Sequence, residues 1–316
     1  MIFSKLNNYI LPKNYLTKIV SKDKELLSKT ILETRKDTKN YEDSWGYIIQ
    51  ATRYLKLKWY DKKNNSLIFF GKKSETDPTL VVVNYFAEPA YLKNVIDIVQ
   101  KKLNFKRTIL KNVSPENVSL LTSYGFRQYS KNEYWDKAAR FDDQTYPQQI
   151  IDLTVVLEKK GQKFKRLRNT LYKKNQLTIH KYTKKDKEEV LRLFVAKDSS
   201  ASHPAQSKSG IYYESHAMYP DAFLEKFVIK SNTKEIIGFT AFSPITSKTC
   251  AFVATIFKPN NGMIGIWGIY QILVMIHEKG FQYVNFGGSE AEGTFNFVRR
   301  TFRPVEEVSK IHLIYP

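Results

Sequence analysis

The chain has 316 residues, 42% of them hydrophobic and 14% aromatic, which favours two domains with medium-sized cores over a disordered protein. It contains no run of about 20 apolar residues and no secretory leader, so we expect a soluble, cytoplasmic protein. Its formal charge of +20 attracts polyanions such as RNA, DNA, anionic lipid or nucleotides, although a lysine-rich proteome produces the same excess.

Strand and helix signals alternate in the first half of the chain. The β-rich runs SLIFFG and TLVVVNYF predict strands at 66–71 and 79–86, and apolar residues at helical spacing predict a helix over 92–103. A strand is predicted at 105–110, and a helix over 114–125 opens with a serine and a proline and stops at a glycine. This β-α-β-α succession favours parallel strands joined by right-handed crossovers.

The second half repeats this alternation after a polar, aperiodic stretch that ends at Pro147. We therefore place the domain junction there, with one domain at 1–146 and the other at 147–316. Strands are predicted at 152–158, 177–183, 236–242, 250–257 and 283–286. Helices are predicted from Lys163 onward, around 190–194, at 264–279 and at 295–302, and a flexible loop at 196–213. The shared element order predicts two copies of one α/β architecture.

Two stretches of the second half suggest a binding site. From Lys163 the sequence KFKRLRNTLYKKN places cations on one side of a helix and apolar residues on the other, and a solvated basic helix explains the same pattern. Near its C-terminal end the sequence YVNFGGSEAEGTFNFVRRTF runs from a strand through two glycines into a helix with two arginines. Paired glycines permit close approach of a ligand, and arginine can clamp phosphate or carboxylate, although a simple turn also explains the glycines.

Taken together, these stretches resemble the Fem peptidyltransferases and the C-terminal domain of lysyl-phosphatidylglycerol synthases. The resemblance rests on a basic helix of the form K-x-x-R-N and, at a suitable distance, the pattern (D/N)-F-G-G followed by a basic helix. The matching positions are Lys165, Arg168, Asn169, Lys173, Asn285, Phe286, Gly287, Gly288, Gly293, Arg299 and Phe302. It covers mainly residues 150–316 and implies an α/β (α+β) chain of two tandem GNAT-like domains, each a mixed twisted sheet flanked by helices.

The resemblance implies an enzyme that transfers an aminoacyl group from a charged tRNA to an amine or hydroxyl acceptor, such as a lipid, a peptide or a small molecule. No cofactor or metal is implied. It assigns substrate binding to Lys165, Arg168, Lys173, Gly287, Gly288 and Arg299. Because the spacing after the glycines is uncertain by one residue, Arg300 is a rival for the role of Arg299. In the first half, Glu88 and Pro89 replace the glycine-rich turn by which GNAT enzymes bind coenzyme A, so we expect that domain to be non-catalytic.

Aminoacyl transfer needs a base that deprotonates the attacking ammonium group. The candidates in and near the predicted loop are Asp198, His203, Glu214 and His216, each of which can instead be an ordinary surface residue. Trp267 is a candidate for the wall of a ligand cavity. Five histidines and one cysteine without ligand spacing argue against a metal, and Cys250 lies in an apolar run that predicts a buried thiol.

Two alternative functions remain open from the sequence. An acyl-CoA-dependent N-acyltransferase needs amides at a helix start for the pyrophosphate of acetyl-CoA or another acyl-CoA, and Asn261, Gly262 and Gly265 could supply them. A non-catalytic protein that binds nucleic acid or anionic lipid would keep the fold and the charge without the chemistry.

Overall fold

The computed structural model describes residues 15–52, 54–72, 76–128, 146–172, 177–199, 219–258, 262–288 and 292–316. These residues form two compact units. Unit 1 holds the described residues of Met1–Asp23, Ala51–Trp135 and Lys310–Pro316, and unit 2 holds those of Lys24–Gln50 and Asp136–Ser309. We predict one junction, at 146/147; among the described residues the chain passes between the units at 23/24, 50/51 and 309/310, and residues 128 and 146 belong to different units.

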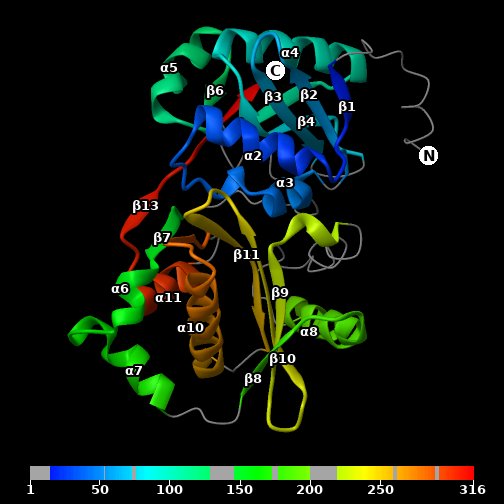
Figure 1. The fold of residues 1–316 in the computed structure, drawn as a ribbon. Coiled ribbons are helices and arrows are strands. Elements are labelled where there is room, and N and C mark those ends of the chain that lie inside the picture. Colours follow the sequence, from blue (N-terminus) through cyan, green and yellow to red (C-terminus); the bar gives the residue numbers. More distant parts are fainter. Residues whose placement is uncertain are drawn as a thin grey trace. The chain divides into compact units, whose positions relative to one another are not determined.

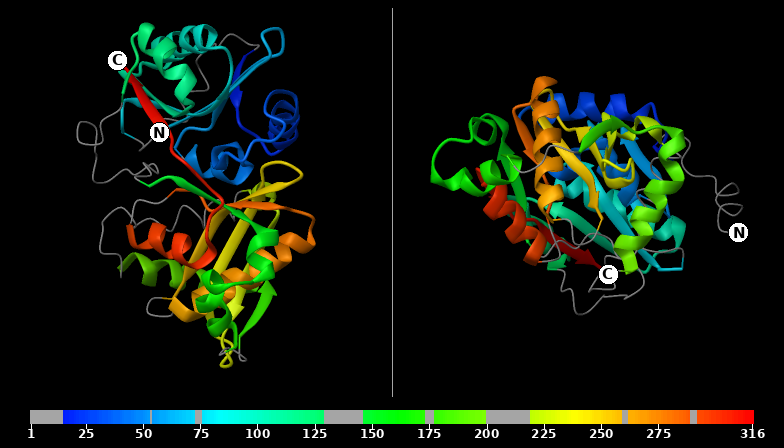
Figure 2. Two further views of the ribbon diagram at one scale, coloured as in Figure 1. Left: turned by 90° about the vertical axis from the view of Figure 1, so that its left-hand side faces the viewer. Right: turned by 90° about the horizontal axis from the view of Figure 1, so that it is seen from below.

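Unit 1 is a seven-stranded mixed sheet in the order β1-β2-β3-β4-β5-β14-β6. Its elements are β1 (Leu16–Lys18), β2 (Leu57–Asp61), β3 (Ser66–Lys72), β4 (Thr79–Phe86), α4 (Pro89–Leu103), β5 (Arg107–Val113), α5 (Pro115–Ser123), β6 (Arg127–Gln128) and β14 (Ile311–Tyr315). Strands β4 and β5 are parallel, as the β-α-β succession predicts. Figures 1 and 2 show the red strand β14 among the strands of this unit, antiparallel to both β5 and β6.

The core of unit 1 forms where predicted strands and the apolar stripe of α4 meet. All eight residues of β4 are buried, which is typical of a central strand covered on both faces. Helix α4 begins with a proline at its first position and buries Leu92, Val95, Ile96 and Val99 along one face. It ends at Asn104 in the left-handed conformation.

Unit 2 is a second seven-stranded mixed sheet, in the order β13-β7-β12-β11-β10-β9-β8. Its strands are β7 (Gln148–Asp152), β8 (Thr178–Lys181), β9 (Glu225–Lys230), β10 (Ile236–Pro244), β11 (Thr249–Phe257), β12 (Tyr283–Asn285) and β13 (Glu306–Val308). Its α-helices are α2 (Asp23–Thr34) and α3 (Trp45–Ala51), each with one end residue in unit 1, together with α6 (Leu153–Glu158), α7 (Lys165–Tyr172), α8 (Lys187–Ser199), α10 (Gly262–Glu278) and α11 (Glu292–Phe302). Among the described residues of this unit, short 3₁₀ turns lie at Tyr41–Asp43, Gln162–Phe164, Lys184–Asp186 and Pro220–Ala222.

Helices cover both faces of the sheet in unit 2. Figure 1 shows α10 and α8 on opposite faces. Apolar residues of α10, including Ile269, Ile272 and Leu273, join the main core with residues of β11 and α11. On the other face, Phe194 of α8 lies edge-on to Phe239 of β10, with ring centroids 5.5 Å apart. The two mixed sheets with flanking helices confirm the predicted fold class.

The predicted strand at 152–158 is wrong. Residues 153–158 form helix α6, and only Asp152 belongs to a strand. The Asp152 carboxylate accepts hydrogen bonds from the backbone amides of Thr154 (2.9 Å) and Val155 (3.3 Å), so it caps the helix. This cap and the burial of Val156 outweigh the preference of the β-branched residues for a strand.

Cys250 is buried in β11, as predicted, and burial raises the pKa of its thiol well above the ordinary value. Within the described ranges, no helix is long and apolar enough to cross a membrane.

A buried carboxylate fixes the start of α8. Asp186 Oδ2 accepts hydrogen bonds from the amide and hydroxyl of Thr183 (2.9 and 2.8 Å), and Lys230 Nζ lies 2.9 Å from Asp186 Oδ1. Burial raises the pKa of Asp186, but Lys230 and the bonds from Thr183 outweigh it, so the pKa lies below the ordinary value.

We expect Asp186→Asn to lower the free energy of unfolding at pH 7 by about 1–3 kcal/mol, because it removes charge-assisted hydrogen bonds from a buried site. Since the folded-state pKa is depressed, the wild-type carboxylate stabilises the fold above about pH 4 and loses this contribution as the pH falls through its folded-state pKa. Urea unfolding of both proteins should therefore differ at pH 7 and converge in acid. Glu235→Gln, in an exposed pair with Lys258, is the control and should change stability by less than about 0.5 kcal/mol.

Candidate functional site

Strands β11 and β12 separate soon after they pair. Only Thr249–Ala251 of β11 pair with Tyr283–Asn285 of β12, although β11 continues to Phe257. Past Asn285 the chain stays beside β7, since the Phe286 amide donates to the Gln149 carbonyl (2.9 Å). Beyond Ala251, β11 therefore has β10 as its only strand partner within the described ranges. We call this separation the splay.

The segment 39–46, far away in sequence, packs at the splay within unit 2. The Tyr41 hydroxyl donates to the Val253 carbonyl of β11 (3.3 Å), and the Gly46 amide donates to Ser243 Oγ of β10 (3.1 Å). Lys39 Nζ lies 4.2 Å from the centroid of the Tyr283 ring. The second residue of β11 past its ladder with β12 is thus held by a side chain of this segment.

A buried amide network anchors this segment to β7 and β12. Asn285 Nδ2 donates to the Lys39 carbonyl (2.6 Å) and to Gln148 Oε1 (2.9 Å), while Asn285 Oδ1 accepts from the Gly287 amide (2.7 Å). Gln148 Oε1 also accepts from the Tyr41 amide (3.2 Å), and Gln148 Nε2 donates to Glu42 Oε1. Asn285 and Gln148 are at most 1% exposed, so the network is isolated from solvent.

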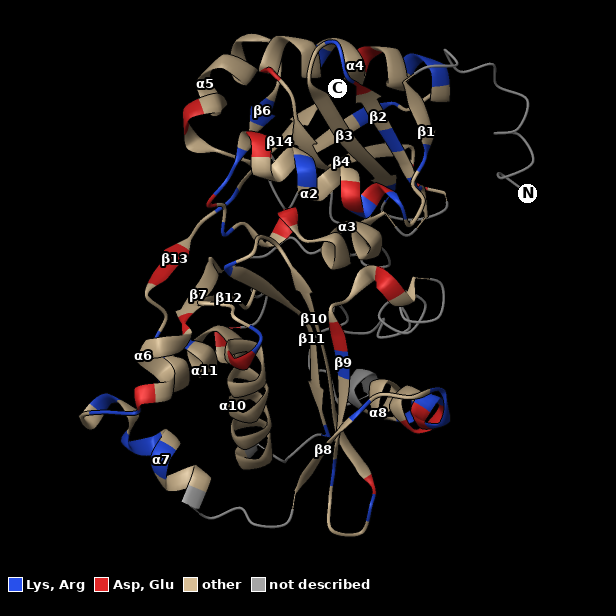
Figure 3. Ribbon diagram, viewed as in Figure 1, with Lys and Arg blue, Asp and Glu red and all other residues tan. Residues whose placement is uncertain are grey.

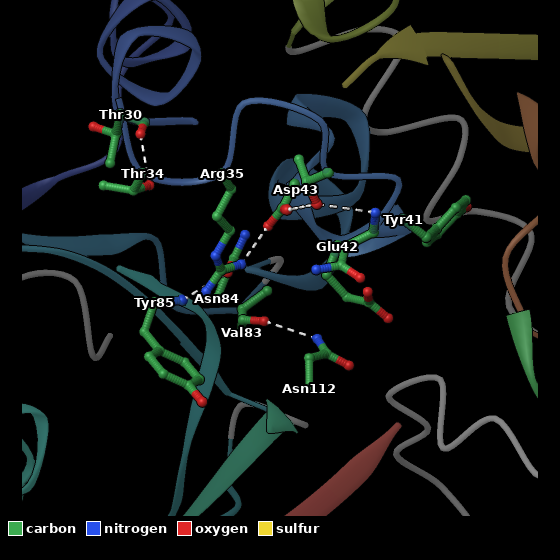
Figure 4. Close-up of polar contacts among 12 residues, drawn as sticks. Thr30, Thr34, Arg35, Tyr41, Glu42, Asp43, Val83, Asn84, Tyr85 and Asn112 are labelled. Carbon is green, nitrogen blue, oxygen red and sulfur yellow. Dashed lines mark hydrogen bonds and ion pairs between the residues drawn. The ribbon is translucent and has the colours of Figure 1, made fainter. Parts of the chain in front are cut away.

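An ion pair closes the turn that leads into this segment. Figure 4 shows Arg35 directed at Asp43, whose carboxylate lies 2.9 Å from Arg35 Nη1. The Thr38 hydroxyl donates to the second oxygen of Asp43 at 2.7 Å. Because the side chain of Asp43 is fully buried, these contacts offset the cost of removing its charge from water.

Unit 1 has a similar separation of its parallel strands. Strand β4 pairs with β5 only over Thr79–Val82, and Asn112 Nδ2 then donates to the Val83 carbonyl (3.3 Å), as Figure 4 shows. In both units, a side chain thus holds a carbonyl one or two residues past the end of the parallel ladder. Glu88 and Pro89, which motivate the expectation of a non-catalytic first domain, lie at the start of α4.

The paired glycines of the C-terminal landmark lie directly at the splay. Gly287 is buried and has a φ of +71°, a region that favours glycine. A Cβ atom placed there would lie 3.2 Å from the Tyr41 ring. Glycine at position 287 therefore permits the backbone conformation of the turn and leaves room for the Tyr41 ring. Gly288, its neighbour, is partly exposed.

We expect Gly287→Ala to destabilise the protein by about 1–2 kcal/mol, because an L side chain is strained at this φ and meets the Tyr41 ring. Chemical denaturation would measure the loss. Gly293→Ala is a matched control: Gly293 lies in α11 with no atom within 4 Å of an added Cβ, so this change should stabilise by about 0.5–1 kcal/mol. Equal effects of the two substitutions would contradict the proposed strain at Gly287.

The two candidate arginines differ in their surroundings on α11. Arg299 Nε lies 3.3 Å from Glu307 Oε1, and its guanidinium lies 5.7 Å from the centroid of the Phe295 ring. Arg300 is exposed, and within the described ranges its guanidinium forms no ion pair or hydrogen bond. Arg300 is therefore the more available of the two for an anionic ligand.

Cations cluster on helix α7 and the turn before it, and we call this stretch the basic segment. It consists of Lys159, Lys160, Lys163, Lys165, Arg166 and Arg168, and Figure 3 shows blue along α7 and the turn before it. Lys165 is exposed, whereas the Arg168 guanidinium donates to the main-chain carbonyls of Lys159 and Gly161 and so helps to hold the turn. Lys173 lies outside the described residues.

The end of α7 reaches the start of α10. The Thr170 hydroxyl lies 3.8 Å from Met263 Sδ, and α10 begins at Gly262 with no acidic residue in its first turn. Gly265 packs against the Phe257 ring: a Cβ atom added to this glycine would lie 3.5 Å from the ring. Trp267 is partly exposed. Asn261 lies outside the described residues.

The candidate bases cannot be located from the described residues. Asp198 belongs to α8, but its side chain is not described, and His203, Glu214 and His216 lie outside the described ranges. No group of three His, Cys, Asp or Glu side chains that could hold a metal is found in the part of the chain that the structure describes.

Sequence reasoning missed the partners of Asn285. Gln148, Tyr41 and Lys39 carry no motif, and the contact from Asn285 to Lys39 spans 246 residues. The sequence of β7, QQIID, places a second glutamine beside Gln148 and an aspartate at its end, so nothing in the sequence distinguishes Gln148 as the buried partner.

No protein-family model and no curated protein matches the sequence. Among solved structures, a conserved protein of unknown function from Bacteroides thetaiotaomicron aligns with a TM-score of 0.69 and 16% identity, over 95% of this chain and 99% of the other. FemX aligns with a TM-score of 0.59 and 10% identity, over 94% and 96%. L-PGS from Bacillus licheniformis aligns with a TM-score of 0.56 and 17% identity, over 92% and 91%.

A tandem GNAT protein from the clavulanic acid biosynthesis pathway aligns with a TM-score of 0.55 and 9% identity, over 95% of this chain and 97% of the other. Identities this low show the fold alone. The chain therefore has the tandem GNAT fold, and the predicted resemblance to Fem and lysyl-phosphatidylglycerol synthase proteins is confirmed at the level of the fold.

Proposed function

We propose that the chain is an acyltransferase that moves an aminoacyl group from a charged tRNA to an amine or hydroxyl acceptor. The observation that carries this proposal is the fold shared with FemX and L-PGS over more than nine-tenths of each chain. The two sequence landmarks, which point to the same group, support it. So does the basic segment beside the start of α10, since three of its cations, Lys163, Lys165 and Arg166, have no acidic partner within the described ranges.

The chemistry asks little of the protein beyond positioning. An aminoacyl ester is already activated, so orientation of the attacking group and donors for the developing oxyanion supply most of the rate. In this proposal Lys165 and Arg168 of α7, Arg300 of α11 and Lys173, which lies outside the described residues, bind phosphates. One of Asp198, His203, Glu214 and His216 accepts the proton of the attacking ammonium.

The proposal is tested by isolating the protein from cells and sequencing any bound RNA, followed by incubation with a mixture of aminoacyl-tRNAs. We expect enriched tRNA and loss of the aminoacyl ester from at least one tRNA when an acceptor extract is added. Recovery of no tRNA, together with tight binding of acetyl-CoA, would disprove the proposal. Salt-sensitive tRNA binding without turnover of any donor would instead indicate a non-catalytic binder.

The second candidate is an acyl-CoA-dependent N-acyltransferase. The observation that favours it is the start of α10 at Gly262, shortly after the end of β11 and without an acidic residue in its first turn. The amides of such a helix start can bind pyrophosphate, and Asn261, Gly262 and Gly265 are the residues that the sequence offers for this role. A thermal shift of several degrees with acetyl-CoA, and none with tRNA, would favour this candidate.

A further inference from the structure

Lys226 on β9 is a partly buried lysine with an aromatic neighbour. Its Nζ lies 5.2 Å from the centroid of the Tyr182 ring, and no acidic side chain pairs with it among the described residues. Burial lowers the pKa of Lys226, because desolvation disfavours the ammonium form. Removing a charge from water without an ionic partner is unfavourable, so the position calls for a functional explanation.

Other lysines of the same region do have acidic partners. Lys230, four residues further along β9 and on the same face of the sheet, pairs with Asp186 at 2.9 Å. Lys279 Nζ lies 2.7 Å from Glu225 Oε1, and Lys258 Nζ lies 2.6 Å from Glu235 Oε1. Among the described residues, no acidic side chain neutralises the charge of Lys226, whereas the charges of Lys230, Lys258 and Lys279 are compensated.

The position of Lys226 connects it to the splay. In register, Lys226 lies opposite Ala241 of β10, which lies opposite Ala254 of β11, so the three side chains form one row on one face of the sheet. Ala254 belongs to the part of β11 beyond Ala251, where the ladder with β12 has ended. Because the other two residues of this row are alanines, no large side chain of the row lies between Lys226 and the splay.

The other end of the row is aromatic. The Tyr182 amide donates to the Lys226 carbonyl (2.9 Å), which continues the pairing of β8 with β9. The Tyr182 ring lies edge-on to Phe239, with centroids 5.8 Å apart, and so is held in place beside the ammonium group. A cation beside an aromatic ring is the combination by which proteins hold single-stranded nucleic acid.

We propose that Lys226, positioned by Tyr182, binds a phosphodiester of the single-stranded end of an RNA at the splay. This inference rests on the proposed function, since it assumes an RNA donor. One ammonium group matches the single negative charge of a phosphodiester. The contact lies on the face covered by α8, as the pairing of Lys230 with Asp186 shows, whereas the basic segment packs with α10 on the other face.

The test measures binding of a fluorescent CCA trinucleotide and of intact tRNA by anisotropy. We expect Lys226→Met to weaken CCA binding by about tenfold, because a charge-assisted contact is lost, and Lys226→Arg to stay within about threefold. The control is Lys181→Met, on the same strand pair but on the opposite face and exposed, which should leave the affinity unchanged. Since no ion pair is broken, Lys226→Met should unfold at a temperature no lower than the wild type.

The outcomes separate the inference from the proposed function. If the wild type binds tRNA but Lys226→Met binds CCA as tightly as the wild type, the inference is wrong and the proposed function stands. If neither RNA binds the wild type, both are wrong. If CCA binding depends on Lys226 but no aminoacyl group is transferred, the inference stands without the proposed function. Stronger competition by a glutamate-rich peptide than by unlabelled CCA would overturn the phosphodiester assignment.

Discussion

Replacing Asn285 with alanine is expected to destabilise the protein by about 3–5 kcal/mol, because buried polar groups that lose a partner cost about 1–3 kcal/mol each and the truncation leaves a cavity. The Gly287 amide and the Lys39 carbonyl both lose the bond from Asn285, and Gln148 Oε1 loses one of two donors. Two segments that are far apart in sequence would be released together.

Urea unfolding measures this loss, and hydrogen exchange at the Gly287 amide reports whether the splay opens locally. Asn296→Ala is the matched control from the same landmark. Asn296 lies on α11, and among the described residues its side chain bonds to exposed Glu292 alone, so the substitution should cost less than about 0.5 kcal/mol. A loss below about 1 kcal/mol for Asn285→Ala would mean that the network does not hold the segment 39–46.

Neutralising the basic segment should have the largest effect on RNA binding. We expect the triple change of Lys163, Lys165 and Arg166 to glutamine to weaken tRNA binding roughly 100-fold at about 0.1 M salt and to reduce the slope of log K against log salt by about 2–3. All three side chains are exposed, and within the described ranges none has an acidic partner, so folding should be unaffected.

The matched control removes the same charge from unit 1. Lys62, Lys63 and Lys101 are exposed, and their change to glutamine lowers the net charge by the same three units. If binding followed net charge alone, both triple variants would lose affinity equally. An equal loss would therefore refute a specific role of α7, whereas a loss confined to the first variant would support it.

Elements with strong local signals could be predicted from the sequence. The apolar spacing of α4 and α10, the hairpin β10–β11 and the glycine stop after α5 are all present as predicted. The prediction was wrong at residues 153–158, where a single aspartate cap decides between helix and strand. Strand β9 was missed, since its sequence EKFVIK has charged residues at both ends and only three buried positions.

The candidate site was predicted only in part, for a physical reason. Gly287 and Gly288 were singled out by their sequence, and they lie at the splay. Their partners come from residues 39–46, and pairing over such a distance leaves no periodic signal in either segment. Lys226 could not be singled out because it is one of 51 basic residues in the sequence. Only the structure shows that it has no acidic partner among the described residues.

Strand β14 has a consequence for the order of biosynthesis. It lies inside the sheet of unit 1, between β5 and β6, and the amide of Asn112 bonds to the ring of His312, 200 residues later. A ribosome must therefore synthesise all of unit 2 before unit 1 can complete its sheet. Until then β5 and β6 expose unpaired edges to which other chains can add. All segments of unit 2, including residues 24–50, have been made once residue 309 is synthesised, so unit 2 can fold before β14 pairs with β5 and β6.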